Sequence, residues 1–115
     1  MQTFTSTGAE KSSFEGLRDA RVRTVAALAP AGVTFSPESL KTISIPVTIY
    51  AGAKDTFLVP RYHAEWVRQN VVKGDYHAIP NAGHYASMDT PWMPIPSPDG
   101  DVGANPEGFD RATFQ

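Results

Sequence analysis

One stretch of the sequence decides the fold, namely Pro46-Val47-Thr48-Ile49-Tyr50-Ala51-Gly52-Ala53-Lys54-Asp55. Its first half, from Pro46 to Ala51, is apolar or β-branched at nearly every position and does not alternate strictly with polar residues. This pattern predicts a strand that is covered on both faces of its sheet. Gly52 then lets the backbone turn, so that Asp55 follows just beyond the carboxyl end of the strand. Ligands and catalytic groups collect at that edge of open α/β sheets.

A second segment repeats this arrangement further along the chain. Residues Asp75 to Ile79 predict a strand, the turn residues Asn81-Ala82-Gly83 follow it, and His84 comes next. Because the carboxyl ends of neighbouring parallel strands meet at one edge of a sheet, we expect the side chains of Asp55 and His84 to lie within hydrogen-bond reach of each other, or one water molecule apart.

The remaining segments predict an α/β fold with three parallel strands and helical crossovers. A strand over Val22 to Leu28 precedes the other two. Capping residues and the helical spacing of apolar residues predict helices over Phe14 to Ala20, Pro37 to Thr42 and Pro60 to Val72. Residues 1–11 show no periodicity, and we expect a loose lead-in there.

The segment that follows His84 has a different character. Residues 88–108 contain five of the ten prolines, which excludes a regular helix or a central strand and predicts a surface loop. Within it, Trp92, Met93 and Ile95 are expected to cover the core. Asn105-Pro106 predicts the start of another helix.

Composition limits the possible functions. A chain of 115 residues forms at most one domain. Ten Lys and Arg residues against twelve Asp and Glu residues give a net charge of −2, which argues against nucleic acid or an anionic membrane as a partner. The absence of cysteine excludes disulfides and a thiol nucleophile. There is neither an apolar run of membrane-spanning length nor a signal-peptide pattern, so we expect a soluble chain, with the cytoplasm favoured over secretion.

The spacing of the acidic residues and histidines predicts neither a metal site nor a cofactor site. A metal would need three convergent ligands, and Asp99-Gly100-Asp101 does not continue as a calcium loop. His63 lies among polar residues of a predicted helix and is expected to be exposed, while His77 falls inside a predicted strand.

Asp55 and His84 match the last two members of a nucleophile–His–acid triad. In such a triad the acid holds the imidazole in the required tautomer, and the imidazole takes the proton of the nucleophile. Taken alone, Asp55 is equally explained as a cap of its loop, and a single histidine such as His84 is more often structural than catalytic. Their joint placement at two strand ends, with the acid first, favours the triad.

Two motifs in this order, Gly52-Ala53-Lys54-Asp55 and Asn81-Ala82-Gly83-His84-Tyr85, resemble the end of the α/β-hydrolase superfamily. The similarity is nearest to the dienelactone-hydrolase-like esterases, in which a Pro-Val strand leads to a Gly-x-x-Asp acid loop and a Gly-His pair follows the last strand. Ala27-Leu28-Ala29-Pro30-Ala31 resembles the preceding strand of that family. The resemblance covers Phe14 to Gln115 and implies a serine hydrolase that cleaves small-molecule carboxylic esters, with Asp55 and His84 as catalytic residues.

The chain departs from this family at the nucleophile. No Gly-x-Ser-x-Gly pattern is present. By the resemblance, residues 1–115 are the carboxyl-terminal portion of one hydrolase domain, without the serine and the oxyanion hole, and we expect this chain alone to be inactive. Self-association is then expected through the strand Val22–Leu28, which would lack its neighbour. The alternative is a truncated, non-catalytic α/β chain that acts through association.

Overall fold

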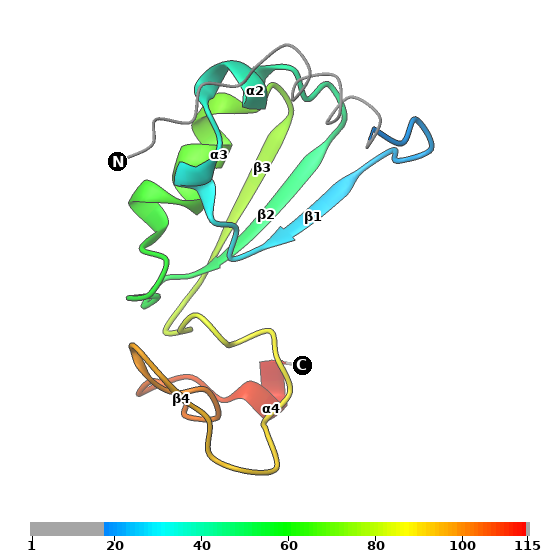
Figure 1. Ribbon diagram of the computed structural model, residues 1–115. Coiled ribbons are helices and arrows are strands. Elements are labelled where there is room, and N and C mark those ends of the chain that lie inside the picture. The colour runs from blue at the N-terminus through cyan, green and yellow to red at the C-terminus, as the bar shows by residue number, and fades with distance from the viewer. Residues whose placement is uncertain (1–17, 115) are drawn as a thin grey trace, which may run out of the picture.

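Three parallel strands form the framework of the computed structural model, which describes residues 18–114. They are β1 (Val25–Leu28), β2 (Val47–Gly52) and β3 (Gly74–Ile79), and they pair side by side in the order β1-β2-β3 (Figure 1). The register aligns Leu28 with Tyr50 and Tyr50 with His77. The prediction of a mixed α/β fold with three parallel strands is confirmed.

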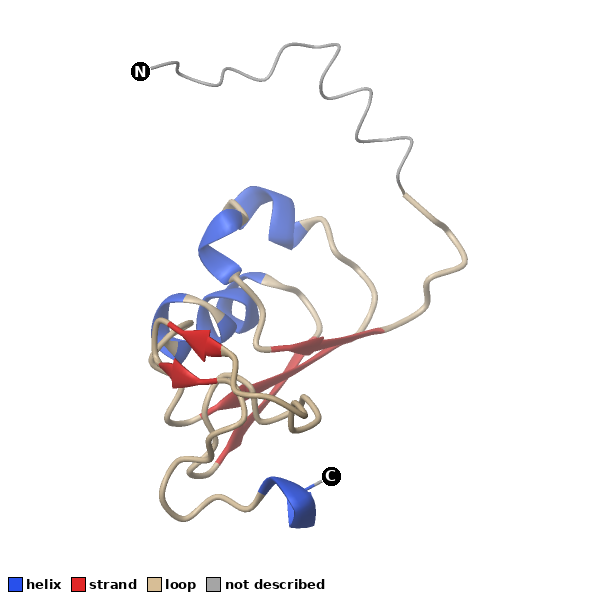
Figure 2. Cartoon of the chain, turned by 60° about the horizontal axis from the view of Figure 1, so that its bottom comes forward, coloured by secondary structure: helices blue, strands red, loops and turns tan. Residues whose placement is uncertain are grey.

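Helical connections join the strands. The first contains the 3₁₀ helix η1 (Gly32–Thr34) and α2 (Pro37–Lys41), whose N-terminus is capped by the Ser36 hydroxyl. The second contains the 3₁₀ helix η2 (Pro60–Tyr62) and α3 (Ala64–Asn70). Both α2 and α3 lie on one side of the sheet, where α3 contacts β2 and β3 (Figure 2).

The hydrophobic core lies between this layer of helices and the sheet. Ile49 is fully buried at its centre, and the other buried members are Leu40, Val47, Ala51, Ala64, Val67 and Val71. On β2 the buried side chains alternate with half-buried Thr48 and Tyr50, which point to the opposite face. The expectation that β2 is covered on both faces is therefore wrong for the described residues, because α2 and α3 lie on one face only and leave Thr48 and Tyr50 half-buried on the other.

Two predicted elements have different bounds. The first strand begins at Val25 and not at Val22, because the Val22 N–H bonds the Asp19 carbonyl at 3.1 Å in a turn. The helix predicted from Pro60 to Val72 is divided, because His63 has non-helical dihedral angles (φ −123°, ψ −83°) between η2 and α3.

The predicted helix from Phe14 to Ala20 falls partly outside the described residues, and residues 18–20 are not helical. At the other end of the chain, the helix predicted from Asn105-Pro106 begins only at Arg111, as α4 (Arg111–Phe114). Gly108 has a φ of 82°, which no α-helix contains, and Asp110 caps α4 by accepting the Ala112 N–H.

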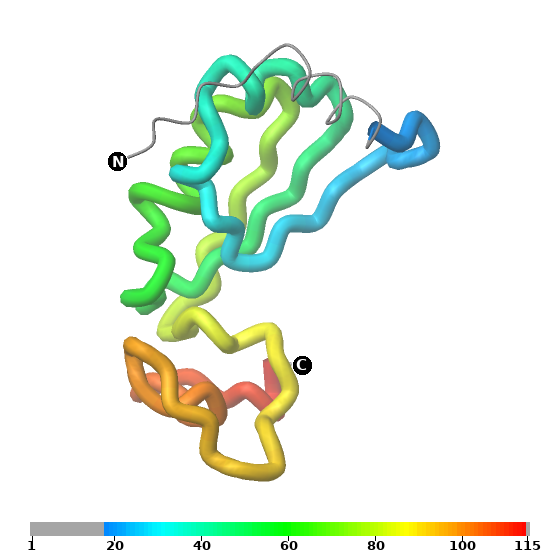
Figure 3. The backbone as a smooth tube through the Cα atoms, in the orientation of Figure 1, coloured from blue at the N-terminus to red at the C-terminus, as the bar shows by residue number. Residues whose placement is uncertain are grey.

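The segment after β3 folds beyond the carboxyl ends of the strands (Figure 3). It contains α4 and a short antiparallel hairpin of β4 (Pro96–Ser97) and β5 (Gly100–Asp101), which the sequence did not predict. The expected hydrophobic cover does not form here, since Trp92 is 92% exposed and Met93 and Ile95 are also exposed. No helix within residues 18–114 is long and apolar enough to cross a membrane.

Candidate active site

The carboxylate of Asp55 is held by backbone groups of its own loop. The turn after β2 is closed by the Asp55 N–H, which bonds the Gly52 carbonyl at 3.1 Å. Asp55 Oδ1 accepts the N–H groups of Phe57 and Leu58 at 2.9 and 2.8 Å. The side chain is fully buried. These bonds offset the cost of burying the charge and fix the direction of the second oxygen, Oδ2.

The loops that follow β2 and β3 are joined to each other by backbone hydrogen bonds. The N–H groups of Ala53 and Lys54 donate to the carbonyls of Ile79 and Ala82 at 3.0 and 2.9 Å. A Cβ atom on Gly52 would lie only 2.4 Å from the Ala82 carbonyl oxygen. Only glycine permits this approach, so Gly52 determines how close the two loops lie.

This approach brings the two predicted catalytic residues together. Nδ1 of His84 lies 2.8 Å from Oδ2 of Asp55, and the His84 side chain is 15% exposed. Because an ionised carboxylate only accepts hydrogen bonds, Nδ1 is the nitrogen that donates to it, and in the neutral form of the ring Nε2 then presents a lone pair. Within residues 18–114, Nε2 has no hydrogen-bond partner. The predicted geometry of the pair is confirmed.

Two aromatic side chains contact the imidazole ring. Phe57 and Tyr85 both meet it edge to face, with ring centroids 5.0 and 4.8 Å from that of His84. Such contacts restrict rotation of the ring, which supports the hydrogen bond to Asp55. Sequence reasoning missed Phe57, although its position two residues after the acid was an available signal.

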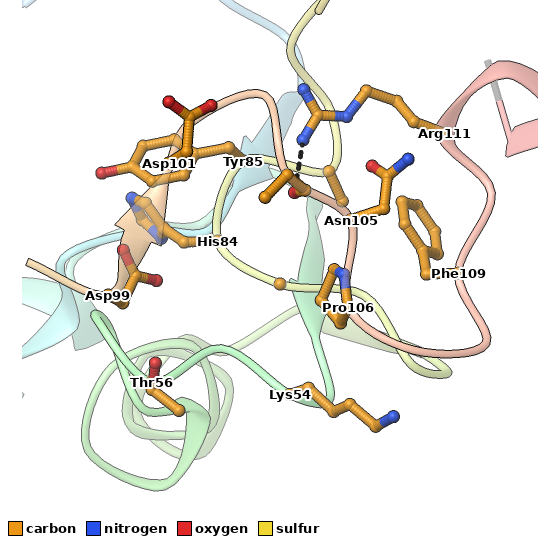
Figure 4. A pocket seen from close by; sticks show the side chains of 13 residues that line it. Lys54, Thr56, His84, Tyr85, Asp99, Asp101, Asn105, Pro106, Phe109 and Arg111 are labelled. Atoms are coloured by element: carbon orange, nitrogen blue, oxygen red, sulfur yellow. Dashed lines mark hydrogen bonds between the residues drawn. The ribbon is translucent and has the colours of Figure 1, made fainter. Parts of the chain in front are cut away.

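A cavity of about 300 Å³ lies beside His84 (Figure 4). Three segments line it: the acid loop, the histidine loop and the C-terminal segment. The side chains labelled in Figure 4 are Lys54, Thr56, His84, Tyr85, Asp99, Asp101, Asn105, Pro106, Phe109 and Arg111. The C-terminal residues were not predicted to belong to the site, because only the fold brings them to His84.

The other two histidines lie elsewhere. His63 is half-buried next to α3, and its Nδ1 is buried without a hydrogen-bond partner in the described part of the chain, so the prediction of an exposed side chain is wrong. His77 lies on the open face of the sheet, stacked on Tyr50, and its Nε2 is 2.8 Å from Asp75. Among residues 18–114, no group of three His, Cys, Asp or Glu side chains is placed to hold a metal ion.

No protein-family model matches the chain, and a search of curated proteins finds no similar sequence.

Proposed function

We propose that this chain supplies the acid and the base of a serine hydrolase that cleaves carboxylic esters. The observation that carries the proposal is the 2.8 Å hydrogen bond between Asp55 Oδ2 and His84 Nδ1, formed just beyond the carboxyl ends of adjacent parallel strands. The sheet is then the carboxyl-terminal part of an α/β-hydrolase sheet. The motifs around both residues, which resemble dienelactone-hydrolase-like esterases, support the same conclusion.

In this mechanism His84 acts first as a general base and then as a general acid. Its Nε2 takes the proton of the nucleophilic hydroxyl as the hydroxyl attacks the ester carbonyl, and then donates that proton to the departing alcohol. Asp55 keeps the Nδ1–H tautomer and stabilises the imidazolium that forms between these steps. No cofactor takes part in this reaction.

The nucleophilic serine would come from a polypeptide segment outside these 115 residues. We place its approach on the side of β1, because Leu28 and Ala29 at the end of β1 line a small hollow together with His84. The described residues contain serines, but none has the flanking glycines of a Gly-x-Ser-x-Gly turn. The chain by itself is therefore proposed to be inactive.

The test uses the longer polypeptide encoded in frame with this chain. We expect it to contain a Gly-x-Ser-x-Gly motif, to hydrolyse p-nitrophenyl acetate and to be labelled by a fluorophosphonate at that serine. Asp55→Asn should lower kcat by about 10⁴-fold, and His84→Ala by about 10⁶-fold, the scale found when a triad loses its histidine.

The second Asp–His pair of the chain provides a matched control. Asp75→Asn and His77→Ala alter a pair with the same 2.8 Å separation and should leave kcat unchanged. Labelling of the 115-residue chain itself, or full activity of His84→Ala, would exclude this assignment of the nucleophile and the base.

A second candidate function is a non-catalytic α/β chain that acts through association. It is favoured by the strand β1, whose outer edge pairs with no strand among the described residues. A longer polypeptide without a reactive serine would support this alternative.

A further inference from the structure

Arg111 is a buried cation with an unusual set of partners. It is the first residue of α4 and only 3% exposed. Its Nη1 donates to the Met88 carbonyl at 3.3 Å, and its Nη2 donates to the carbonyls of Val102 and Ala104 at 3.0 and 3.3 Å. Within residues 18–114 it forms no ion pair with an acidic side chain. Burial of a charge without a countercharge costs free energy, so these three contacts must offset a substantial cost.

The first of these carbonyls belongs to the turn that carries His84. In this turn the Ala86 N–H faces the Gly83 carbonyl at 3.5 Å, and the Met88 N–H bonds the Tyr85 carbonyl at 3.0 Å. His84 therefore lies near one end of a short turn, and the guanidinium of Arg111 is bound at the other end.

The other two carbonyls belong to the segment across the cavity from His84. Ala104 lines the cavity beside His84, and Val102 precedes it in the chain. Figure 4 shows the guanidinium at the edge of the cavity, with its hydrogen bond to the Ala104 carbonyl drawn as a dashed line. One side chain thus ties the histidine turn to the opposite wall.

We propose that Arg111 is a positioning residue for His84, an inference that rests on the proposed function. It holds the turn over residues 84–88 in the place where Nδ1 of His84 meets Asp55, while Phe57 and Tyr85 hold the ring itself. Without Arg111 the turn would lose the hydrogen bond from the guanidinium to the Met88 carbonyl, and the imidazole would spend part of its time away from the carboxylate.

Direct recognition of an anionic ligand by Arg111 is less consistent with these contacts. Three of its N–H groups are already donated to carbonyls. Its Nε is buried and has no partner in the described part of the chain. Without breaking these contacts, a ligand could bind only through the Nε–H and the second N–H of Nη1.

The experiment follows the Nδ1–H proton of His84 by NMR in the 115-residue chain with ¹⁵N-labelled histidine. We compare Arg111→Met, which keeps an apolar stem without donors, with Arg111→Lys, which keeps the charge and one donor group. Arg111→Met should make the proton exchange with water about tenfold faster, the factor that corresponds to one lost hydrogen bond. Arg111→Lys should give an intermediate rate. The protection of the strand backbone amides against hydrogen exchange should be unchanged in both variants.

Arg61→Met serves as the control, because Arg61 is exposed and lies over the ring of Tyr62 at 5.7 Å. In Arg61→Met the His84 Nδ1–H proton should exchange with water at the wild-type rate. One outcome is that Arg111→Met speeds hydrogen exchange of the backbone amides of residues 88–104 and leaves the exchange rate of the His84 Nδ1–H proton unchanged. In that case Arg111 is merely structural and the inference is overturned. Should Arg111→Met not fold, a wild-type exchange rate in folded Arg111→Lys overturns it equally. Absence of a hydrogen-bonded Nδ1–H in the wild type would instead contradict the Asp–His pair itself.

Discussion

Asp55 and Asp75 each pair with a histidine at 2.8 Å, but their surroundings differ. The Asp55 and His84 side chains are 0% and 15% exposed, whereas Asp75 and His77 are 71% and 49% exposed. Water screens the outer pair and leaves it free to separate, so it has little effect on stability. The inner pair is fixed by two further N–H groups on Asp55 and by two aromatic contacts on His84. The candidate catalytic pair is therefore distinguished by its burial and by these additional contacts, and not by the distance alone.

A matched pair of substitutions tests this difference in the free energy of unfolding. Asp55→Asn keeps an oxygen for the Phe57 and Leu58 N–H groups but turns an amide N–H₂ toward Nδ1 of His84, so the charge-assisted hydrogen bond is lost and the imidazole must take the other tautomer. We expect a loss of about 1–3 kcal/mol. Asp75→Asn should change stability by less than about 0.5 kcal/mol. Urea unfolding of both variants measures the difference, and equal effects would contradict the argument from burial.

At the scale of elements, the close approach of the loops after β2 and β3 depends on Gly52. Gly52→Ala would place a Cβ atom 2.4 Å from the Ala82 carbonyl oxygen and 2.6 Å from that of Gly83. Backbone atoms cannot give way as the end of a side chain can, so the loops must separate. We expect a loss of about 1–3 kcal/mol in the free energy of unfolding, together with weaker contact between His84 and Asp55.

Gly103→Ala provides the control for this substitution. The nearest atom to its Cβ would be the Asp101 side-chain oxygen at 3.1 Å, which accepts the Gly103 N–H at 2.8 Å and belongs to an exposed side chain and not to the backbone. It should change stability by less than about 0.5 kcal/mol. Thermal unfolding compares the two variants. An unchanged unfolding temperature of Gly52→Ala would contradict the close approach of the loops after β2 and β3.

The sequence predicted those elements whose signal is local. Strand-forming segments followed by turn residues located all three parallel strands, although the first begins at Val25 and not at Val22. The residues after the other two pointed to Asp55 and His84. The division of the Pro60–Val72 helix was not predictable, because apolar spacing does not register the non-helical backbone at His63. The contacts of Arg111 with Met88, Val102 and Ala104 were equally invisible, since a guanidinium that bonds distant carbonyls leaves no periodic pattern.

At the scale of the whole molecule, the sheet is asymmetric. The helices α2 and α3 cover one face, while Ala26, Leu28 and His77 on the other face remain exposed. The candidate site is built at one end of this sheet, between the strand ends and the C-terminal segment. The sheet is also open at its side, because β1 pairs with β2 alone among the described strands.

Among residues 18–114 no strand pairs with the outer edge of β1, and this strand has no charged residue between Val25 and Leu28. The N–H groups of Val25 and Ala29 donate to the Pro46 and Tyr50 carbonyls beside β2, so that those of Ala26 and Leu28 point outward. Proteins usually protect such an edge with charge, proline or a covering segment. We therefore expect two copies to pair through β1, antiparallel about a twofold axis.

Static light scattering at micromolar concentration should give a mass of at least twice the 12.5 kDa of one chain. Ala26→Pro removes one outward N–H and leaves the bonds to β2 intact, because proline is tolerated where the N–H faces away from the sheet. This variant should be monomeric and should keep its far-UV circular dichroism. Val72→Lys removes an exposed apolar side chain (67% exposed) away from β1 and should not alter the mass. A monomeric wild type would show that another part of the chain covers the edge of β1. Association that survives Ala26→Pro would place the contact elsewhere, with the exposed apolar residues around Trp92 as the next surface to test.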